Sequence, residues 1–286
     1  MPFPSLMPQR LTMEGMIENA NNVLDHAATV DRNGSLATLF QKAKGVMMIS
    51  VVESAVIIKG AAGTGICMVE DEATGKWSAP CSCGLAATGY GLAVGAQVTD
   101  MIIFAFDEKS VRSFTSKTGL KVNAGTQATL GTYGVGADAN LNVSASGIGA
   151  DGNVANYRKG GTATIAFSKG AFASAGISGA IVGPRDHVNH GFYGKKDLTA
   201  QQILFGGTDA DQLLPKDKQT AALKELYKKL DLFSKGQVEK VNPEIFEQTA
   251  GDVPEANINL IESVANEVIE QLDDRPPQTG EIEFKS

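Results

Sequence analysis

The sequence predicts an α+β fold with an antiparallel meander sheet and helices towards both ends of the chain. Apolar and polar residues alternate over 122–130 and again over 137–146. Alternation predicts strands with one buried and one wet face, because neighbouring side chains in a strand point to opposite sides. Apolar residues recur every three or four positions over 12–28 and 217–233, which predicts amphipathic helices that cover the sheet.

The N-terminal region predicts one long amphipathic helix after an irregular, proline-rich start at residues 1–10. Thr12 is a suitable N-cap, and the polar, glycine-containing run at 31–34 is a stop signal. A second, shorter helix is expected over 36–42. The apolar stripe of the first helix consists of Met13, Met16, Ile17, Ala20, Val23, Leu24 and Ala27.

The middle of the chain predicts buried strands separated by glycines. Apolar runs cover 46–52, 56–58, 66–69 and 101–106, a pattern typical of strands buried on both faces. The glycine-rich segment Gly60–Gly65 predicts a turn with positive φ. Residues 76–100 contain the only tryptophan, and alternation from Leu92 to Thr99 predicts a β-hairpin region there. Asp107 is expected to cap a short helix over 108–116.

The second half of the chain predicts more strands and then helices. A hairpin turn is expected at Asp151-Gly152, with alternation over 163–167 and 173–181. The helix at 217–233 has a basic outer face, and another helix is expected from Pro254 to Leu272. The tail at 273–286 is expected to be disordered. The lysines of that outer face are Lys216, Lys218, Lys224, Lys228 and Lys229.

Charge and cysteine content exclude several classes of protein. The formal net charge is −7, and residues 252–286 carry nine acidic side chains against Arg275 and Lys285, which accounts for all of it. An overall basic field for nucleic acid is therefore lacking. Three cysteines are too few for a disulfide framework, which favours a reducing compartment. No apolar run approaches the roughly 18 residues of a membrane span, and no signal peptide is evident. A cytoplasmic location is expected.

No pattern of catalytic or metal-binding residues stands out. The glycines of 60–65 lack the Gly-Lys-Ser/Thr and the helix that a phosphate loop needs. Cys67, Cys81 and Cys83 do not have the paired spacing of a zinc site, and His187 with His190 add only a weak constellation. No nucleophile with an ordered base is present. The expectation is a protein that is not an enzyme and holds neither metal nor cofactor.

Five ordered segments resemble the SYLF domain family, lipid-binding proteins that include the yeast Las-binding actin regulators. The first runs from Trp77-Ser78-Ala79-Pro80 through the spaced glycines to Val98-Thr99-Asp100. The others are Lys42–Val46, Gly60–Gly65, Phe167–Ala173, and Phe192-Tyr193-Gly194 with Gln202–Gly206. The resemblance implies a strongly curved sheet or small barrel closed by the N-terminal helix. It covers about 11–206 and implies a lipid-binding domain there. The residue patterns add an irregular start at 1–10, a helical extension at 207–272 and a disordered tail at 273–286.

The resemblance also implies where lipid would bind, and two interpretations of the first helix stay open. It is either a lid that packs its apolar stripe on the sheet or an interfacial helix that inserts into membrane. An interfacial helix favours basic residues on its polar face, and this one carries Glu14, Glu18 and Asp25. The candidate lipid-binding residues are Arg10, Met13, Met16, Ile17, Lys42, Lys44, Arg158, Lys159 and Lys169.

The function expected from the resemblance is non-enzymatic binding of anionic phospholipid, in particular phosphoinositide, by a peripheral membrane protein that also engages actin filaments. The alternative is an interaction module whose C-terminal helices bind a partner protein. The acidic region at 252–286 has two possible uses. Either its helix pairs with the basic helix through apolar stripes and masks a basic surface, or it is a solvated tail that aids solubility.

Overall fold

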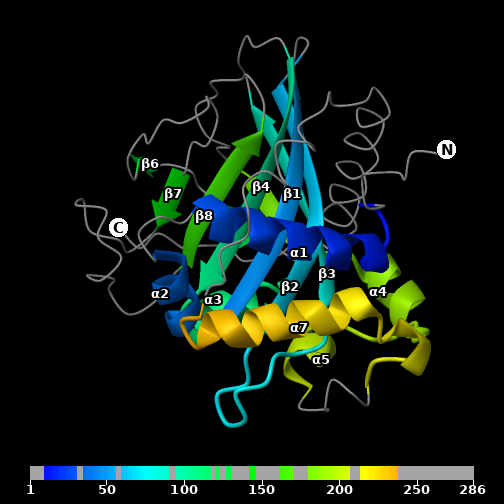
Figure 1. Ribbon diagram of the computed structural model, residues 1–286. Helices are drawn as coiled ribbons and strands as arrows, with labels where there is room; N and C mark the ends of the chain where they lie inside the picture. Colours follow the sequence, from blue (N-terminus) through cyan, green and yellow to red (C-terminus); the bar gives the residue numbers. More distant parts are fainter. Residues whose placement is uncertain are drawn as a thin grey trace, which may run out of the picture.

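The structure is a computed structural model, arranged as Figure 1 shows. It describes residues 10–30, 35–55, 59–89, 95–116, 120–122, 127–129, 142–145, 162–169, 180–206 and 213–237. The described helices are α1 (Met13–Val30), α2 (Ser35–Lys42), α3 (Glu108–Ser113), α4 (Asp186–Tyr193), α5 (Ala200–Phe205), the 3₁₀ turn η2 (Lys216–Lys218) and α7 (Ala221–Ser234). The described strands are β1 (Gly45–Ala55), β2 (Lys59–Val69), β3 (Cys81–Gly89), β4 (Gly95–Ala105), β5 (Leu120–Val122), β6 (Gln127–Thr129), β7 (Asn142–Ala145), β8 (Thr162–Lys169) and β9 (Ala180–Pro184).

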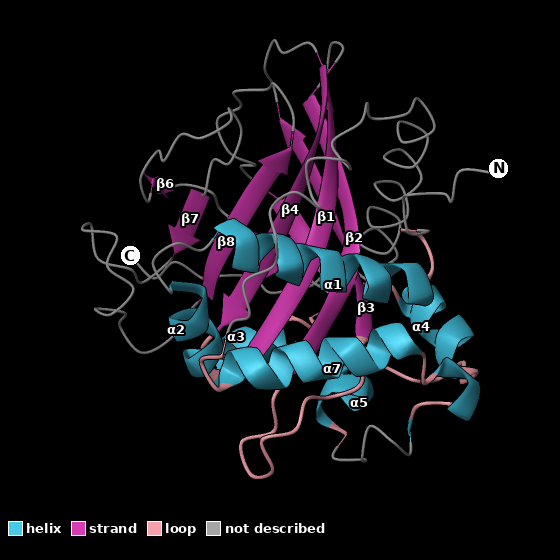
Figure 2. Ribbon diagram, viewed as in Figure 1, coloured by secondary structure: helices cyan, strands magenta, loops and turns pink. Residues whose placement is uncertain are grey.

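The described strands form one antiparallel sheet with α1 and α7 lying side by side across one face (Figures 1 and 2). The α+β class is therefore confirmed, and so is the prediction of helices before the first strand and after the last one. The ring of Phe40 in α2 packs edge-on against Phe104 of β4 at 5.0 Å and against Phe233 of α7 at 5.1 Å. This aromatic cluster joins the two helical ends of the described chain to the sheet.

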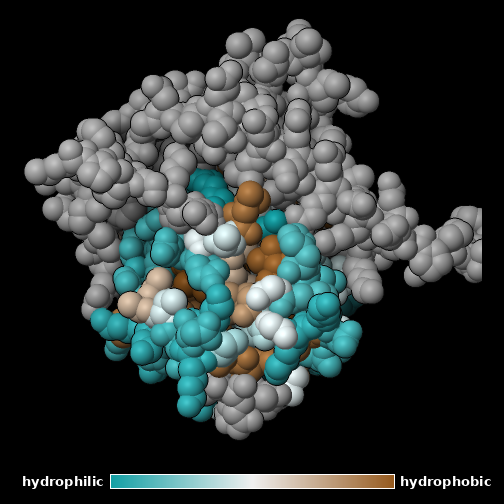
Figure 3. Space-filling model, turned by 90° about the vertical axis from the view of Figure 1, so that its right-hand side faces the viewer, coloured by the Kyte–Doolittle hydropathy of each residue, from teal (hydrophilic) through white to brown (hydrophobic). Residues whose placement is uncertain are grey.

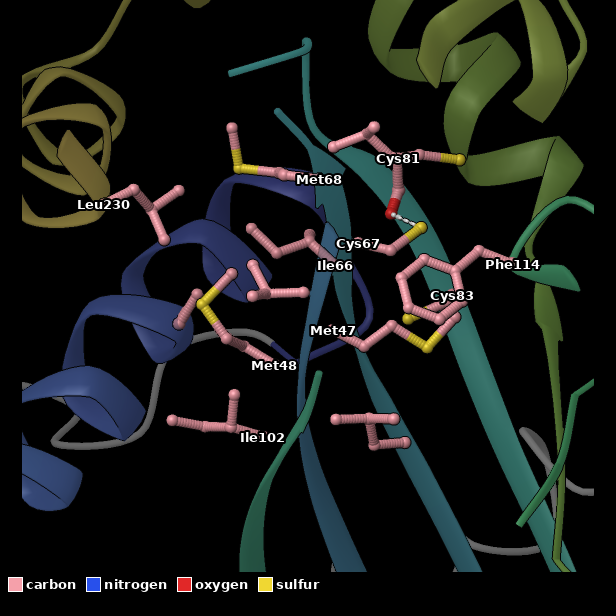
Figure 4. Packing of buried hydrophobic residues seen from close by; sticks show 14 of the residues in the cluster. Met47, Met48, Ile66, Cys67, Met68, Cys81, Cys83, Ile102, Phe114 and Leu230 are labelled. Carbon is pink, nitrogen blue, oxygen red and sulfur yellow. Dashed lines mark hydrogen bonds between the residues drawn. The ribbon is translucent and has the colours of Figure 1, made fainter. Parts of the chain in front are cut away.

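Alternation along the central strands makes two apolar layers, one on each face of the sheet. Met48 pairs in register with Ile66 and Ile102, and all three point towards α1 (Figure 4). Met47, the residue before Met48 in β1, points to the other side of the sheet, where Phe114 packs (Figure 4). These side chains are at most 1% exposed. The described parts of these runs, 46–51, 66–69 and 101–106, are thus buried on both faces, as predicted.

The strand order differs from a meander. It runs β5-β9-β3-β2-β1-β4-β8-β7-β6. The consecutive strands β3 and β4 are separated by β2 and β1, so the prediction of a hairpin within 76–100 is wrong. Gly45 of β1 lies opposite Val69 on one side and opposite Ala105 on the other. The pattern of 76–100 correctly indicated strands but could not show that β4 pairs with the far side of β1.

The prediction of a strongly curved sheet or small barrel is also wrong. The sheet is open: β5 and β6 stand at opposite ends of the order, and no ladder joins them among the described strands. The small residues that suggested tight curvature have a different use at two positions of β2. A Cβ at Gly65 would collide with the carbonyl oxygen of Met48, and one at Gly63 would lie 2.8 Å from the Val51 side chain. Glycine here permits close approach of β2 to β1 rather than closure.

The glycine segment at 60–65 is therefore strand, not the predicted turn. Among the described residues, positive φ occurs at Gly75, Gly194 and Gly236. Gly75 ends the tight turn between β2 and Trp77.

Several helices follow from local capping signals. Thr12 accepts a hydrogen bond from the Gly15 amide at 3.2 Å, and Asp107 accepts one from the Ser110 amide at 2.8 Å. Both predicted N-caps are thus confirmed. The helix expected from residue 217 begins at Ala221, because Thr220 caps it. The prediction missed α4 and α5, although α5 starts with a capping box between Thr199 and Gln202.

Other predictions lie outside the described residues. These are the start at 1–9, the apolar run 56–58, the alternation at 137–141, the turn at Asp151-Gly152, and the helix and tail beyond residue 254. A search of the described helices finds none with the length and apolar character needed to cross a membrane.

Candidate functional site

The predicted lipid-binding stripe of α1 packs on the sheet. Met13, Met16 and Ile17 are each 1% exposed and belong to the main apolar core. This is the arrangement that the lid interpretation expects. Two features distinguish α1 from an ordinary core helix. Polar side chains lie beside its apolar stripe, and its outer side carries charged side chains.

A row of polar side chains crosses the sheet directly beneath α1. Thr64, Ser50 and Asp100 are register partners on β2, β1 and β4, and none is more than 3% exposed. Asn19 of α1 donates a hydrogen bond of 2.7 Å to Ser50 Oγ, and Ser50 Oγ donates in turn to Asp100 Oδ1. Asn19 thereby ties α1 to the sheet through a buried polar chain.

Two basic groups complete this buried polar layer, which comprises Arg10, Asn19, His26, Ser50, Thr64 and Asp100. His26 Nδ1 lies 3.7 Å from Asp100 Oδ2, and Thr64 Oγ1 donates to the Arg10 carbonyl at 2.7 Å. Burial lowers the pKa of Arg10, and the Asp100 carboxylate opposes that shift. The buried Arg10 Nε and Nη1 have no hydrogen-bond partner among the described residues. The layer is thus only partly satisfied, which weakens its contribution to stability.

The acidic face of α1 is paired with α7. Glu14 Oε1 lies 2.5 Å from Lys218 Nζ, and Asp25 Oδ1 lies 2.7 Å from Lys229 Nζ. Between them Asn21 Nδ2 donates to the Ala222 carbonyl at 2.9 Å. These three contacts, called the seam below, follow both helices in the same direction, so α1 and α7 run parallel. Burial would raise the pKa of Glu14, but the hydrogen bond from Lys218, a backbone hydrogen bond and the Lys218 charge together lower it.

The seam explains why α1 lacks a basic polar face. Its carboxylates bind lysines of a helix that follows about 200 residues later in the chain. The predicted basic face of α7 is consequently divided. Lys218 and Lys229 turn to α1, and Lys229 also contacts Glu225 at 2.9 Å.

Two lysines of α7 point away from the seam. Lys224 and Lys228, called the outer lysines below, are exposed and four residues apart, so they share one face of the helix. Neither forms an ion pair with a described residue. The next lysine, Lys235, contacts Asp231 at 2.7 Å. Lys216, in the turn before α7, is also exposed.

The other predicted site residues are spread over the molecule. Lys42 is exposed in the last turn of α2, and Lys44 forms an ion pair with Glu72. Lys44 donates its amide to Ala105, whereas Lys169 lies opposite Val98. These residues of β4 are seven positions apart, roughly 23 Å along a strand. The described structure thus does not gather the predicted basic residues into one patch. Arg158 and Lys159 lie outside the described residues.

Apolar surface is scarce on the described part of the molecule. Leu11, just before α1, is the exposed large apolar residue there, with 44% of its surface accessible. Figure 3 shows the side on which α1 and α7 begin, where hydrophobic surface lies between hydrophilic borders.

The cysteines are buried in the core, whereas His187 is exposed and His190 makes a local polar contact. Cys67, Cys81 and Cys83 are buried and free. The contact with the Cys67 thiol and burial raise the pKa of Cys81 well above its usual range, so this thiol is neutral. His190 Nε2 lies 3.1 Å from the Leu198 carbonyl. Among the described residues no group of three potential ligands could hold a metal.

Sequence reasoning missed the buried polar layer, although part of its signal was present. Asp100 is a charged residue just before the apolar run 101–106, and Ser50 interrupts the apolar run 46–52. A polar residue inside a buried strand needs a partner. Asn19 and His26 gave no such signal, because polar residues are ordinary on an amphipathic helix.

Comparison with known proteins places the chain in a family. The family model Ysc84, described as "Las17-binding protein actin regulator", matches residues 86–232, from β3 into α7. The chain is 31% identical to SH3 domain-containing YSC84-like protein 1 of Xenopus laevis over 193 residues, which are 68% of this chain and 51% of that protein. The human protein of the same name is 31% identical over 198 residues, 69% of this chain and 51% of that protein.

A yeast relative shows the same identity over a smaller share. Protein YSC84 of Saccharomyces cerevisiae is 31% identical over 168 residues, 59% of this chain and 33% of that protein. The chain thus spans about half the length of the vertebrate relatives and a third of the yeast one. No solved structure matches. The SYLF resemblance is confirmed: this chain belongs to the Ysc84 family of Las17-binding actin regulators.

Proposed function

We propose that this chain is a non-enzymatic module that binds anionic membrane lipid, a phosphoinositide in particular, and links the membrane to the actin machinery. The observation that carries the proposal is the pair of outer lysines on α7. Lys224 and Lys228 are exposed on one helix face and have no carboxylate partner among the described residues. A lysine near an anionic membrane surface contributes about 1 kcal/mol of binding free energy.

Lys42 extends this basic surface. The last turn of α2 lies beside the end of α7, where a Cβ at Gly236 would collide with the Gln41 side chain. Exposed Lys42 follows Gln41 directly. Lys44 and Lys169, with Arg158 and Lys159, remain proposed as further contacts with lipid headgroups.

We propose a second, apolar contact through α1. Met13, Met16 and Ile17 can reach a membrane only if α1 leaves the sheet, and Leu11 is already exposed at its start. The partly satisfied polar layer supports such a release, because Arg10 Nε and Nη1 would regain water as partners when α1 opens. The exposed helix would then lie in the membrane interface.

The actin part of the proposal is supported by the family description and by the names of the yeast relatives, such as LAS seventeen-binding protein 3. Because the chain covers only part of those proteins, the partner is itself a proposal. We propose a Las17-type regulator or filamentous actin. The description of an actin regulator supports a non-catalytic role. We propose that this role is exercised at the cytoplasmic side of a membrane.

Co-sedimentation with vesicles tests the lipid proposal. The full chain is expected to sediment with phosphatidylcholine vesicles that contain phosphoinositide and to stay in solution with phosphatidylcholine alone. Lys224→Glu with Lys228→Glu should weaken binding more than tenfold, from about 1 kcal/mol per lysine. The matched control reverses the charge of two other lysines by Lys195→Glu with Lys196→Glu. Both are exposed after α4. Equal binding of both variants would contradict a role of the outer lysines.

A second candidate function is an interaction module in which α7 binds an acidic partner protein. The same outer lysines favour it, because an acidic protein surface can take the place of the lipid headgroups. Co-sedimentation of the same two variants with filamentous actin separates the candidates. Loss of actin binding but not vesicle binding in the Lys224 and Lys228 variant would favour the protein partner.

A further inference from the structure

The outer lysines of α7 differ from the other lysines of this region. Lys218 in η2 and Lys229 in α7 contact carboxylates of α1, and Lys235, just after α7, contacts Asp231. Lys224 and Lys228 contact none among the described residues, and Glu225 between them is engaged by Lys229. Lysines of η2 and α7 thus each bind a carboxylate of α1, while the outer face of α7 leaves Lys224 and Lys228 available.

The part of the chain that follows α7 is rich in carboxylates. The described residues end at Gln237, three positions beyond α7. Residues 252–286 carry nine acidic side chains against two basic ones. The acidic side chains are Asp252, Glu255, Glu262, Glu267, Glu270, Asp273, Asp274, Glu281 and Glu283.

The chain between the two is long enough to bring them together. Residues 238–251, about 14 in number, can span up to roughly 46 Å when extended. The 14 residues of α7 cover only about 21 Å. The acidic segment can therefore reach any point on α7. A tether of this length also keeps it at an effective concentration on the order of millimolar.

We infer that the acidic segment 252–286 docks on the outer lysines and competes there with any other anionic ligand. The contact is electrostatic. The apolar side chains of α7, Leu223, Leu226 and Leu230, are at most 1% exposed because they pack in the core. A pairing of apolar stripes, the first possibility drawn from the sequence, is therefore not available on α7.

Carbodiimide crosslinking of the full chain tests this contact without lipid. The reagent joins a lysine to a carboxylate that touches it, and peptide mass spectrometry identifies the pair. We expect Lys224 and Lys228 to crosslink to residues 252–286. The yield should fall several-fold at high salt, since the Debye length shrinks from about 30 Å at 0.01 M to about 3 Å at 1 M. Lys195 and Lys196, exposed after α4, are the internal control. No crosslinks, or an equal yield at the control lysines, would overturn the proposal.

A second full-length variant replaces the nine carboxylates of 252–286 with the corresponding amides. Crosslinks at Lys224 and Lys228 should disappear. The effect on lipid rests on the proposed function: vesicle binding should rise several-fold when the lysines are released. Crosslinks together with unchanged vesicle binding would support docking and contradict lipid binding by these lysines. Vesicle binding that requires Lys224 and Lys228, without crosslinks, would overturn docking alone.

Discussion

Ser50 and Ile49 are neighbours in β1 and face opposite sides of the sheet. Ser50, beneath α1, lies in a polar chain between Asn19 and Asp100. Ile49 is fully buried on the other face, in the same apolar layer as Met47 and Phe114 (Figure 4). Apolar packing needs no specific partners, whereas each polar group beneath α1 depends on one. The α1 face is therefore the one whose helix can be loosened by changing single polar groups.

The largest effect is expected on the apolar face. Phe114→Ala should lower the free energy of unfolding by about 3–5 kcal/mol, because it leaves a cavity in a fully buried layer. Denaturant unfolding checks this value. The loss should be global, so hydrogen exchange should accelerate in β1 as well as in α1. Faster exchange confined to α1 would contradict the difference between the two faces.

A smaller and local effect is expected from Asp100→Asn. The amide keeps the shape of the side chain but removes the charge beside Arg10 and His26, which should cost about 1–3 kcal/mol. Hydrogen exchange should accelerate in α1 before it does in β1. Asp107→Asn is the matched control, because Asp107 caps α3 far from α1 in sequence. Equal acceleration of α1 in both variants would contradict a specific role for Asp100.

The seam is expected to contribute less. Glu14→Lys and Lys218→Glu, made singly, should each loosen α1 by about 0.2–1 kcal/mol, since both side chains are partly exposed. The double variant restores opposite charges and should recover most of the loss. Hydrogen exchange of α1 amides measures all three proteins. If the loss of α1 stability in the double variant equals the sum of the losses in the two single variants, Glu14 and Lys218 do not interact.

The smallest effect is the pH dependence of the seam. Burial opposes ionisation of Glu14, but the hydrogen bond from Lys218, a backbone hydrogen bond and the Lys218 charge together lower its pKa in the folded chain. Its contribution is therefore present above the ordinary value of 4.5 and is lost as the pH falls through the lower folded value. Protection of α1 should decline over that range, and Glu14→Gln should remove this part of the decline. An unchanged profile in Glu14→Gln would assign the decline to other carboxylates.

Local signals predicted much of the fold because they depend on neighbouring residues. Thr12 and Asp107 cap their helices with atoms three residues away. The apolar run 46–52 is a strand because each residue there can be buried on one face or the other. Local reasoning failed at Gly60–Gly65. Glycine is required at Gly65 because a side chain there would collide with the Met48 carbonyl of the neighbouring strand, not because the chain turns.

The candidate site was less predictable, because its parts come from distant segments. The sequence showed an acidic α1 and a basic α7, but not that Glu14 would meet Lys218, 204 positions away. It showed the apolar stripe of α1 but not whether this stripe packs on the sheet or inserts into a membrane. The outer lysines could be recognised only after the seam had identified which lysines were already engaged.

The sequence by itself determined the α+β class, the helix caps at Thr12 and Asp107, most strand segments, the burial pattern of α1 and the family to which the chain belongs. Periodicity and capping act over a few residues, so they can be read along the chain. Only the tertiary structure decided that the sheet is open, that β4 pairs with β1 rather than β3, and that Asp100 lies beneath α1 within the buried polar layer. Those outcomes depend on which surfaces meet, and a local pattern states that a face is buried without stating what covers it.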